Sequence, residues 1–265
     1  MGEIIKRKST SGTGAGNTYA VPALEKAAEI LELLASQPAG LSATEIAARL
    51  GRSMGEIYRV IIALERLRYI TKESDLDRYS LSLKLFELAH RHPPTTRLIH
   101  AAIPILEKLS ANTDQSSHLG VLQNGCLVIL AQVDSPQQMR YSVKIGATLP
   151  TLETSSGVVI LAFSDLRTQE SYLEPLDDTA RAQMLERFNS ARRLGYERWR
   201  SSVVTGVVNL SAPIFNHAGV PQGAITIPYL TQKPERINID QALGKVVAAA
   251  DGLSRSLGWP GSHPL

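Results

Sequence analysis

Two Ser-x-x-Glu motifs, spaced eleven residues apart, constrain the fold of this chain more than any other feature of its sequence. The motifs are Ser42–Glu45 and Ser53–Glu56. Each has the pattern of a capping box, in which a serine caps the first turn of a helix and a glutamate three residues later binds back to the cap. Gly51 lies between them and suits the left-handed conformation that ends a helix before a tight turn. The spacing predicts two short helices that meet at a sharp turn.

Small and apolar residues at suitable positions favour a helix-turn-helix. Ala47 is small where two helices must cross closely, and Ile57 is apolar where the second helix packs back. Two alternating segments follow, Tyr69–Lys72 and Arg78–Leu81, and they predict a two-stranded wing. A plain αα-hairpin is the alternative, since short helix pairs joined by a glycine turn are common. The basic residues of the wing favour DNA binding over that alternative.

Basic residues are concentrated around this motif. Six basic and two acidic residues lie between Arg49 and Lys72, whereas the whole chain has 28 basic and 25 acidic residues. In a winged helix the second helix enters the major groove with its N-terminal residues, and basic side chains nearby bind phosphates. For Glu56 the capping role is favoured over a contact to a cytosine amino group. The expected DNA-binding residues are Arg52, Ser53, Met54, Glu56, Tyr58, Arg59, Lys72 and Arg78.

Length and composition predict about two soluble domains. The chain has 265 residues, of which 43% are hydrophobic and 20% are charged, as is ordinary for globular proteins. No apolar run approaches the ~18 residues that a membrane span needs, so we expect a cytoplasmic protein. The single cysteine, Cys126, excludes an internal disulfide and a multi-cysteine zinc site.

The chain changes character at Pro93-Pro94, where a helix predicted over 82–92 ends. Beyond that point helices flank clustered hairpins, with strands predicted at 118–123, 126–133, 139–145, 207–215 and 223–229. This arrangement indicates an α+β fold with an antiparallel sheet. The predicted parts are a disordered arm over 1–18, a winged helix-turn-helix domain over 19–81, a linker helix over 82–95 and an α+β domain over 96–260.

Segments along nearly the whole chain resemble the IclR family of bacterial transcriptional regulators. In the first half the resemblance rests on LSATEIAARLG and EIYRVIIALERLRYI, and in the second on IGATLPTLETSSGVVILA and GVVNLSAPIFNHAGVPQGAITI. It implies a DNA-binding regulator that is not an enzyme, with a C-terminal effector-binding domain similar to GAF or PAS modules. It further implies homodimers or tetramers on operator DNA, a small organic acid as effector and no cofactor.

The resemblance also implies where the effector binds. Trp199 stands where many members have an acidic or polar residue, so we expect an aromatic or otherwise bulky acid, with its ring between Trp199 and Tyr141. Core packing of Trp199 is the alternative. The N–H groups at Ser155 and Ser156 begin a predicted helix and suit a carboxylate. The expected effector-binding residues are Tyr141, Leu149, Ser155, Ser156, Trp199, Val207, Asn209, Thr226 and Pro228.

The sequence contains no convincing catalytic or metal site. Thr154–Gly157 lacks the first glycine of a nucleophile elbow, and no Walker-type loop occurs. His118 suits the core or a sheet edge better than zinc, and Cys126 suits buried packing. The alternative function is a small-molecule sensor or an enzyme whose N-terminal helices serve only association. The local basic excess and the paired capping motifs favour the DNA-binding regulator.

Overall fold

The computed structural model describes residues 21–73, 76–90, 93–233 and 235–261. The chain divides into two compact units, Met1–His92 and Pro93–Leu265, and each has a hydrophobic core of its own. The arm expected over residues 1–18 lies outside the described residues. Within the described ranges, no helix combines the length and the apolar character that a membrane crossing requires.

The first unit is a three-helix domain with a small wing. Apolar residues at helical spacing bring Ile30, Ile46 and Ile57 into one core, and Tyr79 of the wing closes it. Gly51 ends the second helix with a φ of +63°, as the motif predicts. The elements are α1 (Pro22–Ala35), α2 (Ala43–Leu50), α3 (Met54–Arg66), β1 (Ile70–Glu73), β2 (Arg78–Leu81) and α4 (Lys84–His90).

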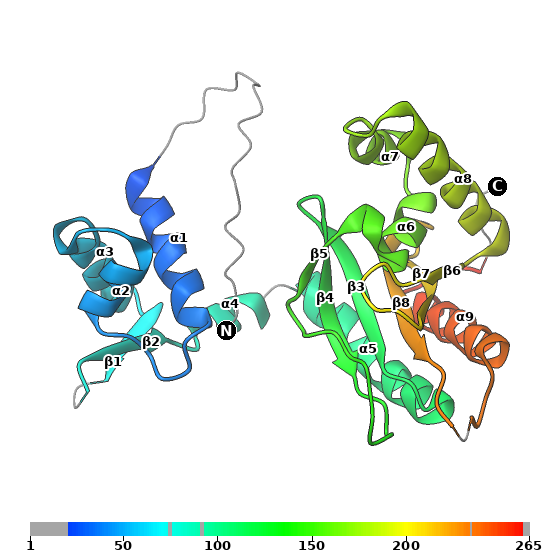
Figure 1. The fold of residues 1–265 in the computed structure, drawn as a ribbon, viewed down its shortest axis with the longest axis horizontal. Helices are drawn as coiled ribbons and strands as arrows, with labels where there is room; N and C mark the ends of the chain where they lie inside the picture. The colour runs from blue at the N-terminus through cyan, green and yellow to red at the C-terminus, as the bar shows by residue number, and fades with distance from the viewer. Residues whose placement is uncertain (1–20, 74–75, 91–92, 234, 262–265) are drawn as a thin grey trace. The chain divides into compact units, whose positions relative to one another are not determined.

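The second unit is built on one antiparallel sheet of six strands in the order β5-β4-β3-β8-β7-β6 (Figure 1). The strands are β3 (Ser117–Gln123), β4 (Cys126–Val133), β5 (Thr148–Pro150), β6 (Glu197–Arg200), β7 (Val207–Phe215) and β8 (Pro221–Leu230). The helices are α5 (Pro93–Thr113), the 3-10 turn η1 (Thr151–Glu153), α6 (Ser155–Ala162), α7 (Leu166–Leu173), α8 (Asp178–Leu194) and α9 (Ile239–Ser256).

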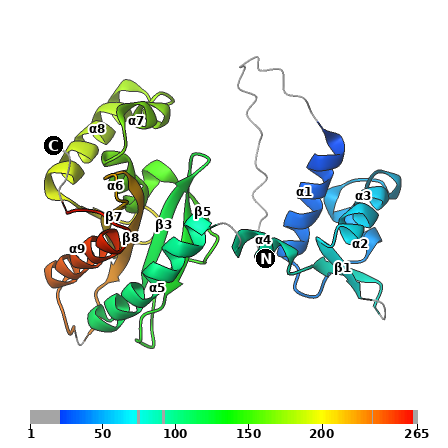
Figure 2. The ribbon, with the colours of Figure 1, turned by 180° about the vertical axis from the view of Figure 1, so that it is seen from behind.

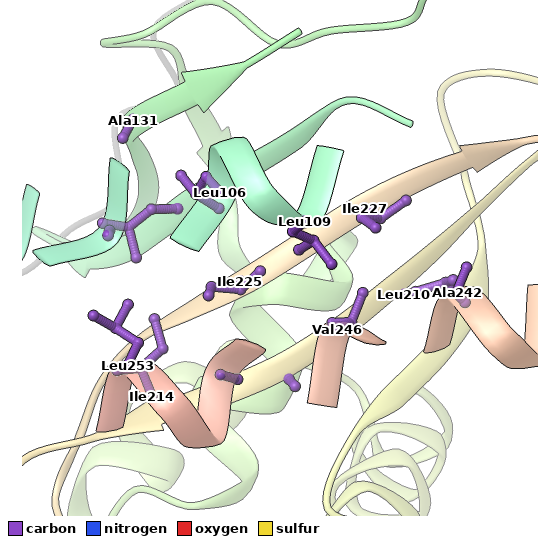
Figure 3. Packing of buried hydrophobic residues seen from close by; sticks show 14 of the residues in the cluster. Leu106, Leu109, Ala131, Leu210, Ile214, Ile225, Ile227, Ala242, Val246 and Leu253 are labelled. Carbon is purple, nitrogen blue, oxygen red and sulfur yellow. The ribbon is translucent and has the colours of Figure 1, made fainter. Parts of the chain in front are cut away.

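Helices α5 and α9 cover one face of this sheet (Figures 1 and 2). Leu106 of α5 and Val246 of α9 pack there against Ile225 and Ile227 of β8 (Figure 3). Side chains alternate along a strand, so Thr226, between the two isoleucines, points to the opposite face. We call that opposite face the inner face.

Helix α6 covers the inner face and is buried along its whole length. Phe188 and Ala191 of α8 pack against it from outside. At Gly157 a Cβ atom would lie 2.2 Å from the carbonyl oxygen of Thr151, so the first turn of α6 touches the backbone of η1. This contact fixes where α6 begins relative to the sheet.

The structure confirms the predicted α+β class and most predicted elements. Asn124 and Gly125 form the predicted hairpin turn, and both have the positive φ that a type I′ turn requires. The strand predicted over 139–145 is wrong. The chain turns at Gly146, where φ is +80°, and its N–H donates to the carbonyl oxygen of Ile129 in β4 at 2.8 Å, whereas the regular pairing with β4 begins only at Thr148.

Two further differences have simple causes. Helix α4 ends at His90, before Pro93-Pro94 as predicted, but α5 begins at Pro93, inside the linker predicted over 82–95, because a proline is tolerated in the first turn, where its missing N–H is not needed. Strand β6 was not predicted, because three of its four residues are exposed and its sequence, Glu-Arg-Trp-Arg, has no apolar alternation.

Candidate DNA interface and effector site

Both predicted capping motifs start helices in the structure. At α2 the Ser42 N–H donates to Glu45 Oε2 at 2.8 Å, and the Glu45 N–H donates to Ser42 Oγ at 3.2 Å. At α3 the Glu56 carboxylate accepts from the N–H of Ser53 at 2.9 Å and from its hydroxyl at 2.8 Å. These bonds hold the pKa of the Glu56 carboxyl below its usual value. Glu56 thus has the capping role that was favoured for it.

One face of α3 is exposed along its length, and it includes two of the predicted DNA-binding residues. Tyr58 and Arg59 lie on it together with Gly55, Ile62 and Arg66, which the sequence did not single out. Their spacing of three and four residues places them in one stripe. A Cβ atom at Gly55 would meet nothing within 4 Å, so the backbone of the first turn is open on this side. Helical periodicity of the exposed residues could have found this stripe.

Other predicted DNA-binding residues hold the unit together. Arg52 donates from Nε and Nη2 to the two carboxylate oxygens of Glu29 at 2.8 Å each, which ties the turn to α1. Arg78 donates to the carbonyl oxygen of Gly40 and pairs with Glu45 at 3.0 Å. Their guanidinium groups therefore serve contacts within the fold.

The remaining predicted residues lie near the turn and on the wing. Ser53 is exposed at the start of α3, and Met54 is half-buried beside it. Lys72 of β1 pairs with Asp77 at 2.5 Å and lies 5.4 Å from the centre of the Tyr79 ring. Because the Lys72 ammonium is exposed and paired at the surface, this pair costs little to exchange for a phosphate.

On the inner face of the sheet, five adjacent strands each place one polar residue in a single line. Glu197 pairs with Ser211, Ser211 with Thr226, and Thr226 with His118, which in turn pairs with Gln132. We call this line the polar row. Thr226 is the only one of the five among the predicted effector-binding residues.

The first turn of α6 lies against the middle of the polar row. The hydroxyl oxygen of Ser156 is 2.7 Å from that of Thr226, which is also 2.7 Å from that of Ser211. Thr154 caps the helix by accepting from the N–H of Gly157 at 3.0 Å. The N–H groups of the first helical residues have no acceptor within a helix, so those of Ser155 and Ser156 are suited to an anion.

Glu197, at the end of the polar row, is a buried carboxylate that sequence reasoning missed. Its Oε1 accepts from Nε of Arg187 at 3.0 Å, and Nη2 of Arg187 lies 2.9 Å from the same oxygen. Burial raises the pKa of Glu197 to about 7, against the opposing effects of Arg187 and the nearby Ser155 hydroxyl.

Trp199 is stacked on this ion pair. The guanidinium carbon of Arg187 lies 4.3 Å from the centre of the indole ring, within the range of a cation–π interaction. Trp199 is 49% exposed, so it is not packed in the core as the alternative had it. Arg187 covers one face of the indole, and an aromatic effector would have only the other face available.

At the other end of the row, His118 and Gln132 each have a buried atom that makes no hydrogen bond, Nδ1 and Oε1 respectively. Burial lowers the pKa of His118 to about 4, so the imidazole is neutral at physiological pH. The described residues contain no group of His, Cys, Asp and Glu that could hold a metal ion. His118 is 5% exposed, which is the buried position that the sequence favours for it.

The other predicted effector residues lie on β5, β7 and β8 and in the segment before β5. Asn209 of β7 pairs across the sheet with Trp199 on one side and with Pro228 on the other. Val207 is buried at the start of β7. Leu149 of β5 packs against the core beneath α6, and Tyr141 is half-buried in the irregular segment before β5.

Two family models match the chain and together cover both units. The helix-turn-helix domain of IclR matches residues 23–74, and the C-terminal domain of the bacterial transcriptional regulator IclR matches residues 94–255. Among curated proteins, the HTH-type transcriptional regulator KdgR of Escherichia coli (strain K12) is 27% identical over 224 residues. That match covers 82% of this chain and 85% of the relative.

Solved structures share the fold. An IclR homologue from Microbacterium hydrocarbonoxydans, in complex with 4-hydroxybenzoate, has a TM-score of 0.75 at 20% identity and covers 89% of this chain and 98% of its own. The IclR protein of Thermotoga maritima has a TM-score of 0.71 at 24% identity, with the same two coverages. At such identities the likeness shows the fold alone.

Proposed function

The chain belongs to the IclR family of bacterial transcriptional regulators, and on this premise we propose that it binds operator DNA as a dimer under the control of an organic acid. Its first unit is the DNA-binding domain and its second is the effector-binding domain of such a regulator, which is not an enzyme. The operator contacts, the oligomer and the class of effector are parts of the proposal.

The exposed stripe of α3 carries the DNA-binding part of the proposal. Tyr58 and Arg59 project from it, and the open backbone at Gly55 permits close approach to a groove. Arg52 and Arg78, whose guanidinium groups bind within the fold, position the turn and the wing. We therefore assign base and phosphate contacts to the stripe first, with Ser53, Met54 and Lys72 at its margin and Glu56 as the cap.

The exposed apolar surface of α4 supports a dimer. Leu83, just before α4, is 76% exposed, and Leu88 on it is 43% exposed. Both line a groove of about 680 Å³ between α4 and the wing, which charged residues such as Lys72 and Glu87 also line. Apolar side chains that are exposed as a group mark protein interaction surfaces more often than single scattered ones do. A second copy of this chain is the proposed occupant, because operator half-sites one helical turn apart require two recognition helices.

The effector part of the proposal rests on the polar row and the first turn of α6. A carboxylate at the N–H groups of Ser155 and Ser156 would lie next to the hydroxyls that meet at Thr226. The outer face of the Trp199 indole is available to an aromatic ring, with Asn209 and Pro228 beside it. A relative of the same fold binds 4-hydroxybenzoate, an aromatic acid. We propose an aromatic or similarly bulky carboxylic acid as the effector.

Binding of the full chain to DNA from upstream of its own gene tests this function. We expect tight binding that resists competitor DNA and weakens steeply with salt, because phosphate contacts release counterions. A panel of aromatic acids should shift the operator affinity, and the operator should shift the acid affinity by the same factor. Acid binding that is identical with and without operator would contradict the coupling, and sedimentation of the free protein tests the dimer.

A further inference from the structure

Three buried polar atoms at the Glu197 end of the polar row make no hydrogen bond. They are Glu197 Oε2, Ser155 Oγ and Arg187 Nη2, of which Nη2 still contacts Glu197 Oε1 at 2.9 Å as part of the ion pair. Glu197 is 6% exposed and Ser155 is 2% exposed. Buried polar groups in native proteins are nearly always hydrogen-bonded, so three together at one place require an explanation. One explanation is a bound molecule that supplies the missing hydrogen-bond partners.

The geometry of the ion pair leaves one carboxylate oxygen of Glu197 without a hydrogen-bond donor. Both Nε and Nη2 of Arg187 approach the same oxygen of Glu197, Oε1, at 3.0 and 2.9 Å. Arginine–carboxylate pairs are frequently bidentate, with one nitrogen on each oxygen, as in the pair of Arg52 with Glu29. Here Oε2 is left as an acceptor without a donor. Ser155, which lies close enough to lower the pKa of Glu197, makes no hydrogen bond of ordinary geometry to it.

Ser155 is also the first residue of α6, so the unfilled acceptor lies beside the helix end that suits a carboxylate. Arg187 balances the charge of Glu197, and a second carboxylate can therefore approach without facing a net negative charge. A ligand that binds both places must carry a hydrogen-bond donor close to its carboxylate. A hydroxyl on the adjacent carbon satisfies this requirement.

We propose that Glu197 is a specificity-determining residue of the effector site, which accepts a hydrogen bond from the hydroxyl of a 2-hydroxycarboxylic acid. The acid's carboxylate binds at the N–H groups of Ser155 and Ser156. Arg187, held by its stack on Trp199, is a positioning residue that keeps Oε2 turned toward the effector. This inference rests on the proposed organic-acid function and narrows it to a subclass.

Three acids that differ at one carbon test the proposal on the full-length protein. Mandelate has a hydroxyl there, phenylglyoxylate has a carbonyl oxygen, and phenylacetate has neither. By isothermal titration calorimetry at pH 8, above the pKa of Glu197, mandelate should bind about tenfold or more tightly than the other two acids, because only its hydroxyl can donate a hydrogen bond to the ionised carboxylate. A carbonyl oxygen facing Glu197 Oε2 brings two acceptors together.

Glu197→Gln should reverse this preference. Arg187 donates toward the Oε1 position and so holds the amide oxygen there, which places the amide NH₂ where Oε2 was. The site then presents a donor, and phenylglyoxylate should bind more tightly than mandelate. Glu170→Gln is the matched control, since Glu170 is an exposed carboxylate paired with Arg181 on the surface of α7 and α8. It should keep the wild-type order.

The results distinguish the proposed acid-binding function from the proposed role of Glu197. If the wild type binds the three acids within twofold of one another, the acid-binding function stands and the role of Glu197 falls. If Glu197→Gln folds and keeps the wild-type order, the role of Glu197 also falls. If the wild type binds none of the three, both the aromatic-acid function and this inference are overturned. Should Glu197→Gln fail to fold, the order of the three acids on the wild type alone decides.

Discussion

The hydroxyl oxygens of Ser156 and Thr226 lie 2.7 Å apart and join the first turn of α6 to a central strand of the sheet. Thr226 also binds Ser211 at 2.7 Å, and all three side chains are at most 2% exposed. Each hydroxyl therefore depends on the others for its hydrogen bonds. The start of α6, where the effector carboxylate is proposed to bind, is fixed by this trio as well as by its contact with η1.

Thr226→Val should lower the free energy of unfolding by about 1–3 kcal/mol, because it leaves two buried hydroxyls without their shared partner. Thr226→Ser keeps the hydroxyl and should recover part of the loss, with the missing methyl as the remaining cost. Urea unfolding of the two variants measures the difference. Equal stabilities for Val and Ser would show that the trio contributes nothing.

The stability of the second unit should depend on pH through Glu197. Its pKa rises from 4.5 in the unfolded chain to about 7 in the fold. Between these values the folded carboxyl keeps a proton that the unfolded one has lost, so stability falls as the pH rises. The change amounts to roughly 3 kcal/mol over this window. Glu197→Gln should remove it, because an amide does not titrate.

His118 acts in the opposite direction and must be separated from Glu197. Its pKa falls from 6.5 to about 4 on folding, so the fold loses stability as the pH drops from 6.5 to 4. The two effects partly cancel in the wild type. The difference in unfolding free energy between wild type and Glu197→Gln, measured from pH 4.5 to 8, isolates the carboxylate. A flat difference curve would mean that Glu197 titrates normally.

Arg59→Ala should weaken operator binding and reduce the slope of log K against log salt by about one, if Arg59 binds one phosphate. Arg181→Ala is the matched control, because it removes the same charge from an exposed ion pair in the second unit. Fluorescence anisotropy across a salt series measures both slopes. An unchanged slope for Arg59→Ala would remove Arg59 from the interface.

Gly55→Ala separates folding from DNA binding at the start of α3. The new methyl meets nothing within 4 Å, and alanine is the better helix former, so stability should rise by about 0.5–1 kcal/mol. If the backbone here approaches DNA, the same methyl should weaken operator binding. If the variant is more stable and its operator affinity equals that of the wild type, the DNA contacts another part of α3.

Local patterns made much of the first unit predictable. The two Ser-x-x-Glu motifs predict where α2 and α3 begin, because a capping box depends on residues only three apart. Which basic residues face outward was less predictable. Arg52 and Glu29 are 23 residues apart, and nothing in either segment by itself shows that they meet.

In the second unit, contacts between segments distant in sequence were even less predictable. The family resemblance could assign Ser155, Ser156 and Thr226 to the proposed effector site, but it could not indicate Glu197 and Arg187. Their pairing depends on the register of β6 against β7 and on the rotation of α8, which are set by tertiary packing. A charged strand of four residues carries too weak an alternation to be predicted from its own sequence.

The two strands at the centre of the sheet, β3 and β8, come from opposite ends of the second unit. His118 pairs with Thr226, more than a hundred residues later. During synthesis the ribosome must therefore release almost the whole chain before this sheet can close, and until then the β3 edge has no neighbour on that side. The first unit, whose wing ends at Leu81, is complete long before. A nascent chain thus acquires its DNA-reading half well ahead of the half that senses the effector.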